Sequence, residues 1–331
     1  MPMLRDELLG VVRWLARLQH RPVVFVFHDV ADSQIFEDCI SEISANRHVV
    51  PLEAIASSRE NDTCAITFDD GRRSVADVAH AVLVAAKLPY TVFVCTDVLM
   101  GGPVPWFIRV DHLVSTIGVE PLRREWALGQ DWVRTKRQLV SALKEFPLDR
   151  VLAGLTRLER EHRLAAPAPE RLFMTPAQVR MLAAAGVAFG AHTCRHPILS
   201  KLNVDGQRWE IETSCASIER LVGSRPSHFA YPNGSRLDFD ATTKTVLRDV
   251  GCKFGYTTVP GYVSPGDDPL ALPRIGLSDE ASIHRALRQL APWLSRVHAR
   301  EGRVRTRVQT GASRPGAVSP RSHQKPRLNA R

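Results

Sequence analysis

The chain has 331 residues, 44% of them hydrophobic and 24% charged, which is typical of a soluble globular protein with one large domain or two smaller ones. The formal net charge of +9 comes from residues 296–331, where ten Lys or Arg accompany the single acid Glu301. Residues 1–295 carry 34 basic and 34 acidic side chains, so the body of the protein gives no electrostatic reason to predict nucleic-acid binding.

The two ends of the chain differ in composition from the middle. Residues 1–21 place apolar residues at helical spacing over 4–18 and predict an N-terminal amphipathic helix. Residues 296–331 are basic, almost free of large apolar side chains, and predicted to be disordered. This tail is either a solvated extension or a peripheral contact with an anionic membrane. Nothing in the sequence indicates an obligate protein partner.

Cysteine spacing and hydropathy indicate the compartment. The six cysteines show no CxxC spacing, no apolar run reaches transmembrane length, and the N-terminus lacks a small-residue cleavage site. These features predict reduced thiols and a cytoplasmic protein.

Short apolar segments alternate with stretches of helical spacing between residues 22 and 295. This alternation predicts a parallel β/α architecture. The predicted strands are 23–27, 65–68, 90–94, 187–191, 228–231, 253–258 and 272–276. The predicted helices are 33–46, 74–87 with Ser74 as its cap, 175–185, 205–222, 239–250 and 279–294. Residues 101–170 interrupt the alternation and are predicted to be a mostly helical insertion.

Two adjacent carboxylates, Asp69 and Asp70, end the second of these predicted strands and are followed by Gly71. At a strand end, one carboxylate can bind a metal ion while the other takes a proton. The alternative is a solvated Asp-Asp-Gly turn.

His192 and His196 follow another predicted strand, four residues apart, a spacing that lets two imidazoles bind one ion. With Asp70 they give one oxygen and two nitrogen ligands, a set that suits Zn²⁺ and can also accept Co²⁺, Mn²⁺ or Ni²⁺. The other polar candidates, His28, Tyr231 and Arg274, also lie at or near the ends of predicted strands. In a β/α barrel those ends form the active-site face.

Three segments resemble, in order and separation, successive motifs of the polysaccharide deacetylase family, the NodB homology domain of carbohydrate esterase family 4. They are Thr67-Phe-Asp-Asp-Gly71, His192-Thr-Cys-Arg-His196 and Phe229-Ala-Tyr-Pro-Asn-Gly234. The resemblance covers roughly residues 22–278 except the insertion. It implies a distorted seven-stranded β/α (TIM-like) barrel and a metal-dependent hydrolase that removes acetyl groups from N-acetylated sugars.

The resemblance also implies roles for the motif residues. Asp69 would be the general base that deprotonates the attacking water. The backbone N–H of Tyr231 would help to hold the oxyanion. Arg274 would pair with Asp69 and keep it ionised. The metal ligands would be Asp70, His192 and His196.

The general acid is where the sequence departs from the family pattern. The late Leu-x-His motif of many members is missing, and the nearest histidine, His284, falls in a predicted helix. His28 resembles a Tyr-His element in a branch of the family that acts on exopolysaccharides, and we predict that it protonates the leaving amine. A hydrogen-bonded structural histidine is the alternative.

The sequence therefore predicts a carbohydrate N-deacetylase that uses a divalent metal, with Zn²⁺ as the expected ion. Its substrate would be a polysaccharide or a lipid- or nucleotide-linked sugar. The alternatives are a metal-dependent hydrolase of a small cyclic amide or ureide, and a carbohydrate-binding pseudoenzyme. The predicted domains are the helix at 1–21, the barrel with its insertion at 22–295 and the tail at 296–331.

Overall fold

The computed structural model describes residues 21–55, 62–129 and 132–277. All of these belong to one compact unit of the chain, Met1–Leu287. The predicted helices at 4–18 and 279–294, the basic tail and His284 lie outside the described residues.

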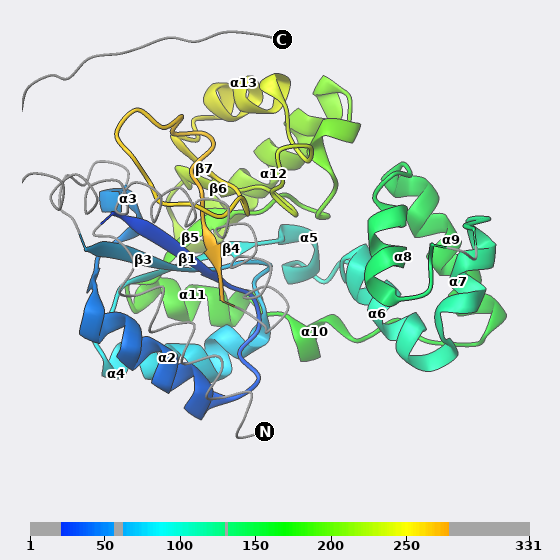
Figure 1. Cartoon of the computed structure of the whole chain (residues 1–331), viewed down its shortest axis with the longest axis horizontal. Helices are drawn as coiled ribbons and strands as arrows, with labels where there is room; N and C mark the ends of the chain where they lie inside the picture. Colours follow the sequence, from blue (N-terminus) through cyan, green and yellow to red (C-terminus); the bar gives the residue numbers. More distant parts are fainter. Residues whose placement is uncertain (1–20, 56–61, 130–131, 278–331) are drawn as a thin grey trace, which may run out of the picture. The chain divides into compact units, whose positions relative to one another are not determined.

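A curled parallel sheet forms the centre of the described unit (Figure 1). Its strands are hydrogen-bonded in the order β7-β6-β5-β4-β3-β1-β8, and the short β2 pairs with β3. The predicted strands are all present, whereas β2 was not predicted. The strands are β1 (Val23–Phe27), β2 (His48–Val49), β3 (Thr63–Phe68), β4 (Tyr90–Val94), β5 (Ala188–Ala191), β6 (His228–Ala230), β7 (Phe254–Tyr256) and β8 (Ile275–Gly276).

The segment 272–276 joins the two ends of this strand order. Leu272 forms a parallel bridge with Tyr256 of β7, and Ile275 pairs with Phe25 of β1. One short stretch of chain thus lies between the last strand and the first. The predicted distorted β/α barrel is confirmed in this form, a half-barrel of seven curled strands in which β8 belongs to the segment that bridges β7 and β1.

Helices surround the sheet, which explains why the strands are apolar on both faces. Every residue of β1, β3 and β4 is buried. α2 packs beside α4, α11 beside α12, and α12 beside α13 (Figure 1). These helices are α2 (Ser33–Asn46), α4 (His80–Ala85), α11 (Pro176–Ala184), α12 (Val204–Val222) and α13 (Ala241–Val250). The short helical segments are α3 (Leu52–Ile55), α5 (Thr96–Leu99), α10 (Pro169–Leu172) and η2 (Leu199–Lys201).

The helix predicted at 74–87 is divided in the structure. A π-helical segment, η1 (Val75–Ala79), precedes α4. Ser74 lies at the N-cap position of η1, but its side chain makes no capping hydrogen bond. Its hydroxyl instead accepts the N–H of Val30, at 3.0 Å, and donates to Asp29. Ser74 therefore connects this helical segment to the loop after β1.

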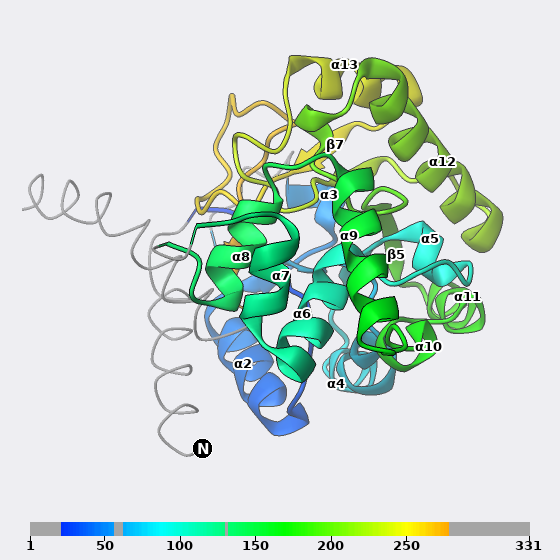
Figure 2. The same cartoon turned by 90° about the vertical axis from the view of Figure 1, so that its right-hand side faces the viewer.

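The predicted insertion contains four helices that share a hydrophobic core of their own (Figure 2). Trp106, Leu113, Leu139 and Leu155 are among its buried residues. A nearly buried ion pair, Arg109 Nη2 to Glu159 Oε2 at 2.7 Å, joins the first and last helices. These helices are α6 (Trp106–Ile117), α7 (Val119–Glu125), α8 (Lys136–Leu143) and α9 (Leu148–Glu161).

Across the described ranges, none of the helices combines the length and the hydropathy needed to cross a bilayer. The predicted contact of the basic tail with a membrane stays a prediction.

Candidate active site

The carboxyl ends of β3 and β5 bring Asp70, His192 and His196 together. One ligand atom from each side chain lies within 4.8 Å of the other two. Asp70 Oδ1 is 3.4 Å from His192 Nε2 and 3.7 Å from His196 Nε2. All three residues are buried. The predicted ligands, separated by more than a hundred residues of chain, thus form one cluster.

The hydrogen bonding of this cluster fits a divalent cation. His192 Nδ1 lies 2.7 Å from the carbonyl oxygen of Ala230, which can only accept, so Nδ1 carries the proton. In the neutral imidazole the lone pair of Nε2 then faces Asp70. Asp70 Oδ1 is buried without a hydrogen-bond partner and faces Nε2 of both histidines. A carboxylate oxygen opposite two imidazole nitrogens is a ligand set that Zn²⁺ and similar ions bind.

Electrostatics keep the cluster ready for a cation. Burial raises the pKa of the Asp70 carboxyl, but the nearby histidines His192, His28 and His196 outweigh burial and hold this pKa well below its usual range. Burial lowers the pKa of His196 to about 3, so its ring is neutral at physiological pH. Burial also lowers the pKa of His192, but Asp70 and Asp69 outweigh it, and the pKa is raised overall. Binding of a metal ion by these three side chains therefore requires the displacement of at most one proton.

Left-handed backbone turns aim these side chains. Asp70 has a φ of 69°, Thr193 of 65° and His196 of 58°, values that few residues other than glycine adopt. Gly71, at a φ of 76°, follows Asp70, and a Cβ there would lie 3.0 Å from Val94 Cγ1. The sequence meets this requirement with a glycine, which has no Cβ. Such strained positions often occur at functional sites.

Asp69 and Arg274 form a fully buried, bidentate ion pair. Nη1 of Arg274 donates to Oδ1 at 2.8 Å, and Nη2 donates to Oδ2 at 2.6 Å. Burial raises the pKa of Asp69, but the charge and hydrogen bonds of Arg274, together with His192 and His28, hold it below its usual range. The structure thus places Arg274 beside Asp69, as the resemblance implies, and keeps Asp69 ionised.

His28 lies at the end of β1 and is half-buried. Its charge contributes to the lowered pKa of both Asp69 and Asp70, so it belongs to the same electrostatic group. The neighbouring Asp29 pairs with Arg72, at 3.3 Å, and accepts from the hydroxyl of Ser74.

Tyr231 departs from the role that the resemblance implies. Its backbone N–H donates to the carbonyl of Tyr256 on β7, at 3.0 Å. Its hydroxyl donates to the carbonyl of Leu270 at 2.6 Å, and its ring stacks on Phe239 with 3.9 Å between the ring centroids. The N–H is therefore already engaged in the sheet and is not a free donor for an oxyanion.

Sequence reasoning missed Glu210, a fully buried carboxylate on α12. Its Oε2 accepts the backbone N–H groups of Cys194, at 2.9 Å, and Arg195, at 3.1 Å. Its Oε1 accepts from Arg195 Nε at 2.7 Å. One side chain thus fixes the loop between the two ligand histidines. The available signal was an acid on the otherwise buried face of a helix, beside Ile211.

Trp106 contacts this loop, and Cys194 is part of it. Trp106 is buried, and its Nε1 donates to the carbonyl of His196 at 3.3 Å. Burial raises the pKa of the Cys194 thiol to about 12, so it stays protonated at neutral pH. Its sulfur lies 3.5 Å from Thr96 Oγ1.

Comparison with protein families gives one match, "Polysaccharide deacetylase", over residues 127–255. The matched range includes both ligand histidines and the 229–234 motif, and the Asp69-Asp70 motif lies before it. Over this range the chain is similar to the polysaccharide deacetylase family. The predicted enzyme class, a hydrolase of the carbohydrate N-deacetylase type, is the class of this family.

Solved structures of deacetylases share the fold. The Streptococcus pyogenes deacetylase PplD in complex with acetate is 16% identical, with a TM-score of 0.53 over 82% of this chain and 98% of its own. IcaB from Ammonifex degensii is 17% identical, with a TM-score of 0.52 over 81% and 96% of the two chains. The BpsB deacetylase domain from Bordetella bronchiseptica is 17% identical, with a TM-score of 0.53 over 78% and 96%. No curated protein matches the sequence.

The buried ion pair gives a stability prediction. Arg274→Met leaves the charge of Asp69 buried and unpaired, so the free energy of unfolding should fall by about 3–5 kcal/mol. The double variant Asp69→Asn/Arg274→Met should recover part of this loss, because the amide carries no charge. Urea denaturation near neutral pH measures the free energy of unfolding of the single and the double variant. As a control, Arg208→Met breaks the exposed pair with Asp249 and should change stability by less than about 1 kcal/mol. A double variant less stable than Arg274→Met would contradict this account.

The same pair sets the sign of a pH dependence. The native pKa of Asp69 lies below its unfolded value, so this group stabilises the fold above about pH 4 and loses that contribution as the pH falls through the native pKa. The double variant Asp69→Asn/Arg274→Met lacks the group. Between about pH 7 and pH 3 its free energy of unfolding should therefore decline less than that of the wild type. Parallel declines would show that another carboxylate dominates.

Metal binding tests the cluster directly. Zn²⁺ added to metal-stripped protein should raise the free energy of unfolding, by about 4 kcal/mol when free ion exceeds Kd about a thousandfold. Asp70→Asn and His196→Gln should abolish this gain, since each removes a ligand. His162→Gln changes an exposed histidine at the end of α9 and should leave it intact. Thermal unfolding measures the stabilisation by zinc, and metal analysis measures the zinc content of each variant. Equal zinc content in all these variants would contradict the predicted ligand set.

Proposed function

We propose that this protein is a metal-dependent hydrolase that removes N-acetyl groups from a carbohydrate, either a polysaccharide or a lipid- or nucleotide-linked sugar. The observation that carries the proposal is the position of two differently partnered carboxylates at one strand end. Asp70 faces two imidazoles, and Asp69 is held by a guanidinium. A metal ligand next to an ionised base is the pairing that metal-assisted amide hydrolysis requires.

In this proposal Asp70, His192 and His196 hold the divalent ion, with Zn²⁺ as the expected ion and Co²⁺, Mn²⁺ or Ni²⁺ as alternatives. A bound ion of this kind polarises the amide carbonyl and lowers the pKa of water. Asp69 accepts the proton of the attacking water. Arg274 orients Asp69 through two hydrogen bonds and keeps it unprotonated until that step.

The leaving amine needs a proton, and we assign its donor to His28. Support comes from its position at the end of β1 and from its electrostatic coupling to Asp69 and Asp70. Histidine is the side chain that most often transfers a proton to or from a reacting group in enzymes.

The family and the related structures support the substrate class. Polysaccharide deacetylases act on acetylated carbohydrates, and PplD, described above, was solved with acetate bound. These facts concern the relatives. For this chain an N-acetylated sugar is the proposed substrate.

Acetate release tests the proposal. Metal-loaded protein should release acetate from at least one member of a panel of N-acetylated oligosaccharides, lipid-linked sugars and nucleotide sugars. Asp69→Ala should reduce kcat by about a hundredfold or more, because general-base catalysis contributes about 10²–10⁴. Its zinc content should stay near the wild-type value.

His28→Gln distinguishes the assigned acid from a structural histidine. Turnover should fall while the zinc content and the thermal midpoint stay near wild type, and unchanged turnover would remove the assignment. Full metal content with no acetate from any sugar would favour hydrolysis of a small cyclic amide or ureide. Sugar binding without any turnover would favour the pseudoenzyme.

A further inference from the structure

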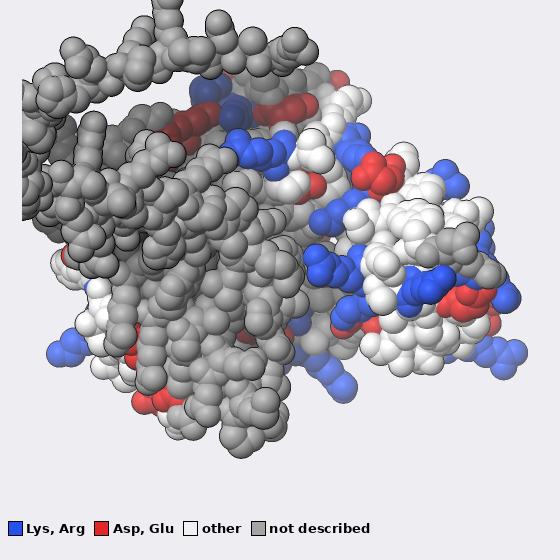
Figure 3. All heavy atoms as spheres, in the orientation of Figure 1, with Lys and Arg blue, Asp and Glu red and all other residues white. Residues whose placement is uncertain are grey.

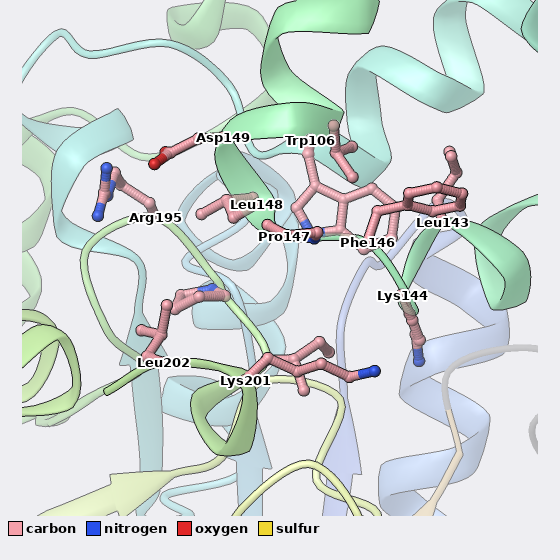
Figure 4. A pocket seen from close by; sticks show the side chains of 13 residues that line it. Trp106, Leu143, Lys144, Phe146, Pro147, Leu148, Asp149, Arg195, Lys201 and Leu202 are labelled. Carbon is pink, nitrogen blue, oxygen red and sulfur yellow. The ribbon is translucent and has the colours of Figure 1, made fainter. Parts of the chain in front are cut away.

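A hollow of about 110 Å³ opens beside the metal-ligand loop (Figure 4). One wall comes from the insertion, from Trp106 and from residues between 143 and 151. The other wall comes from residues between 195 and 202, which begin within the loop. Trp106 lines the hollow and donates to the carbonyl of His196, and the ring of Phe107 lies 4.7 Å from the imidazole of His196. The hollow therefore adjoins the candidate metal cluster.

The lining of the hollow is apolar in the middle and charged at the ends. Trp106, Phe146 and Leu148 contribute to the apolar part. Figure 4 shows Arg195 and Asp149 at one end and the amino groups of Lys144 and Lys201 at the other. An apolar surface between hydrogen-bonding ends suits a pyranose ring, which has apolar C–H faces and a rim of hydroxyl groups.

Arg195 is held in place for binding. Its Nε donates to Glu210 Oε1 at 2.7 Å, and its guanidinium lies 4.8 Å from the centre of the Trp209 ring. No residue in the described part of the chain accepts a hydrogen bond from its two Nη atoms. A guanidinium fixed on one edge and open on the other can donate to hydroxyl groups with little loss of side-chain freedom.

The charges around the hollow are balanced. Lys201 pairs with Glu145 at 2.6 Å, and Arg195 pairs with Glu210 at 2.7 Å. Figure 3 shows acidic and basic side chains interspersed over the insertion on the face in view. The cations that line the hollow are Lys144, Arg195 and Lys201. Three carboxylates balance them, since Asp149 lines the hollow, Glu145 pairs with Lys201 and Glu210 pairs with Arg195. This balance favours a neutral ligand over a phosphate.

We propose that the hollow binds a neutral sugar unit next to the N-acetylated sugar whose amide is cleaved. Its ring would lie on the apolar middle. Its hydroxyl groups would bond to Arg195 and Asp149 at one end and to Lys201 at the other. This inference rests on the proposed function and narrows it, because it makes the insertion of this chain a substrate-binding element and disfavours a sugar joined directly to a diphosphate.

Turnover as a function of chain length tests the site. Acetate release is measured with zinc-loaded protein on four substrates. They are N-acetylglucosamine, two trisaccharides of N-acetylglucosamine that differ in their glycosidic linkage, and N-acetylglucosamine joined to a nucleoside diphosphate. The trisaccharide should give a kcat/KM about tenfold or more above that of the monosaccharide, the size of one or two hydrogen bonds to charged groups. Asp149→Asn and Lys201→Met should each remove most of this gain and leave monosaccharide turnover unchanged.

Matched controls come from the insertion surface. Lys136 and Asp111 form an exposed ion pair away from the lining, so Lys136→Met and Asp111→Asn repeat the two chemical changes outside the hollow. Both control variants should keep the full trisaccharide gain. Faster turnover of the diphosphate-linked sugar than of either trisaccharide would overturn the proposal. Equal effects of Asp149→Asn and Lys201→Met on monosaccharide and trisaccharide would also overturn it.

A binding experiment distinguishes failure of the proposed sugar site in the hollow from failure of the proposed function. If no substrate releases acetate, the proposed function fails, and calorimetry with the trisaccharides on zinc-loaded Asp69→Asn protein decides the hollow. Trisaccharide binding that Asp149→Asn and Lys201→Met weaken by about tenfold would support the site. Absence of trisaccharide binding, or binding that these changes leave intact, would overturn it.

Discussion

The buried ion pair between Asp69 and Arg274 connects the closure of the sheet with the chemistry at its edge. Burying two charges is unfavourable unless geometry and hydrogen bonding are nearly complete. Arg274 meets this condition with two bonds to Asp69 and one to the carbonyl of Thr257. It lies in the segment 272–276 that joins β7 to β1. The contact that fixes the last strand therefore also keeps Asp69 charged.

A second constraint is the shape of the loop between the two histidines. Thr193 and His196 have left-handed backbone conformations, which are unfavourable and must be held by their surroundings. The carboxylate of Glu210 binds two amides of this loop, and the first turn of α5 donates the N–H groups of Thr96 and Asp97 to its carbonyls. The fold thus stabilises a strained loop from two sides, and the two imidazoles are positioned before any ion binds.

Local pattern predicted the parts of the fold and site that depend on short stretches of chain. The bounds of β1 and α2 follow from apolar runs and helical spacing. Asp70, His192 and His196 were identified because each follows a strand, and parallel strands end at one edge. The two-residue β2 is too short to leave a pattern. Tyr231 shows the limit of motif transfer, because the partner of its N–H depends on how β6 pairs with β7. Glu210 was missed because its contacts with two backbone amides and with the side chain of Arg195 depend on the tertiary structure, and the sequence shows only an acid on a buried helix face.

The insertion shows how a separate core can become part of the site. Its helices bury their own apolar cluster, and the pair between Arg109 and Glu159 ties the first helix to the last. That rigidity has a consequence at Trp106, which belongs to this core and also donates to the carbonyl of His196. A shift of α6 would therefore act on a metal-ligand candidate and on the wall of the hollow at once. The proposed substrate contact in the hollow and the geometry at His196 therefore share one buried tryptophan.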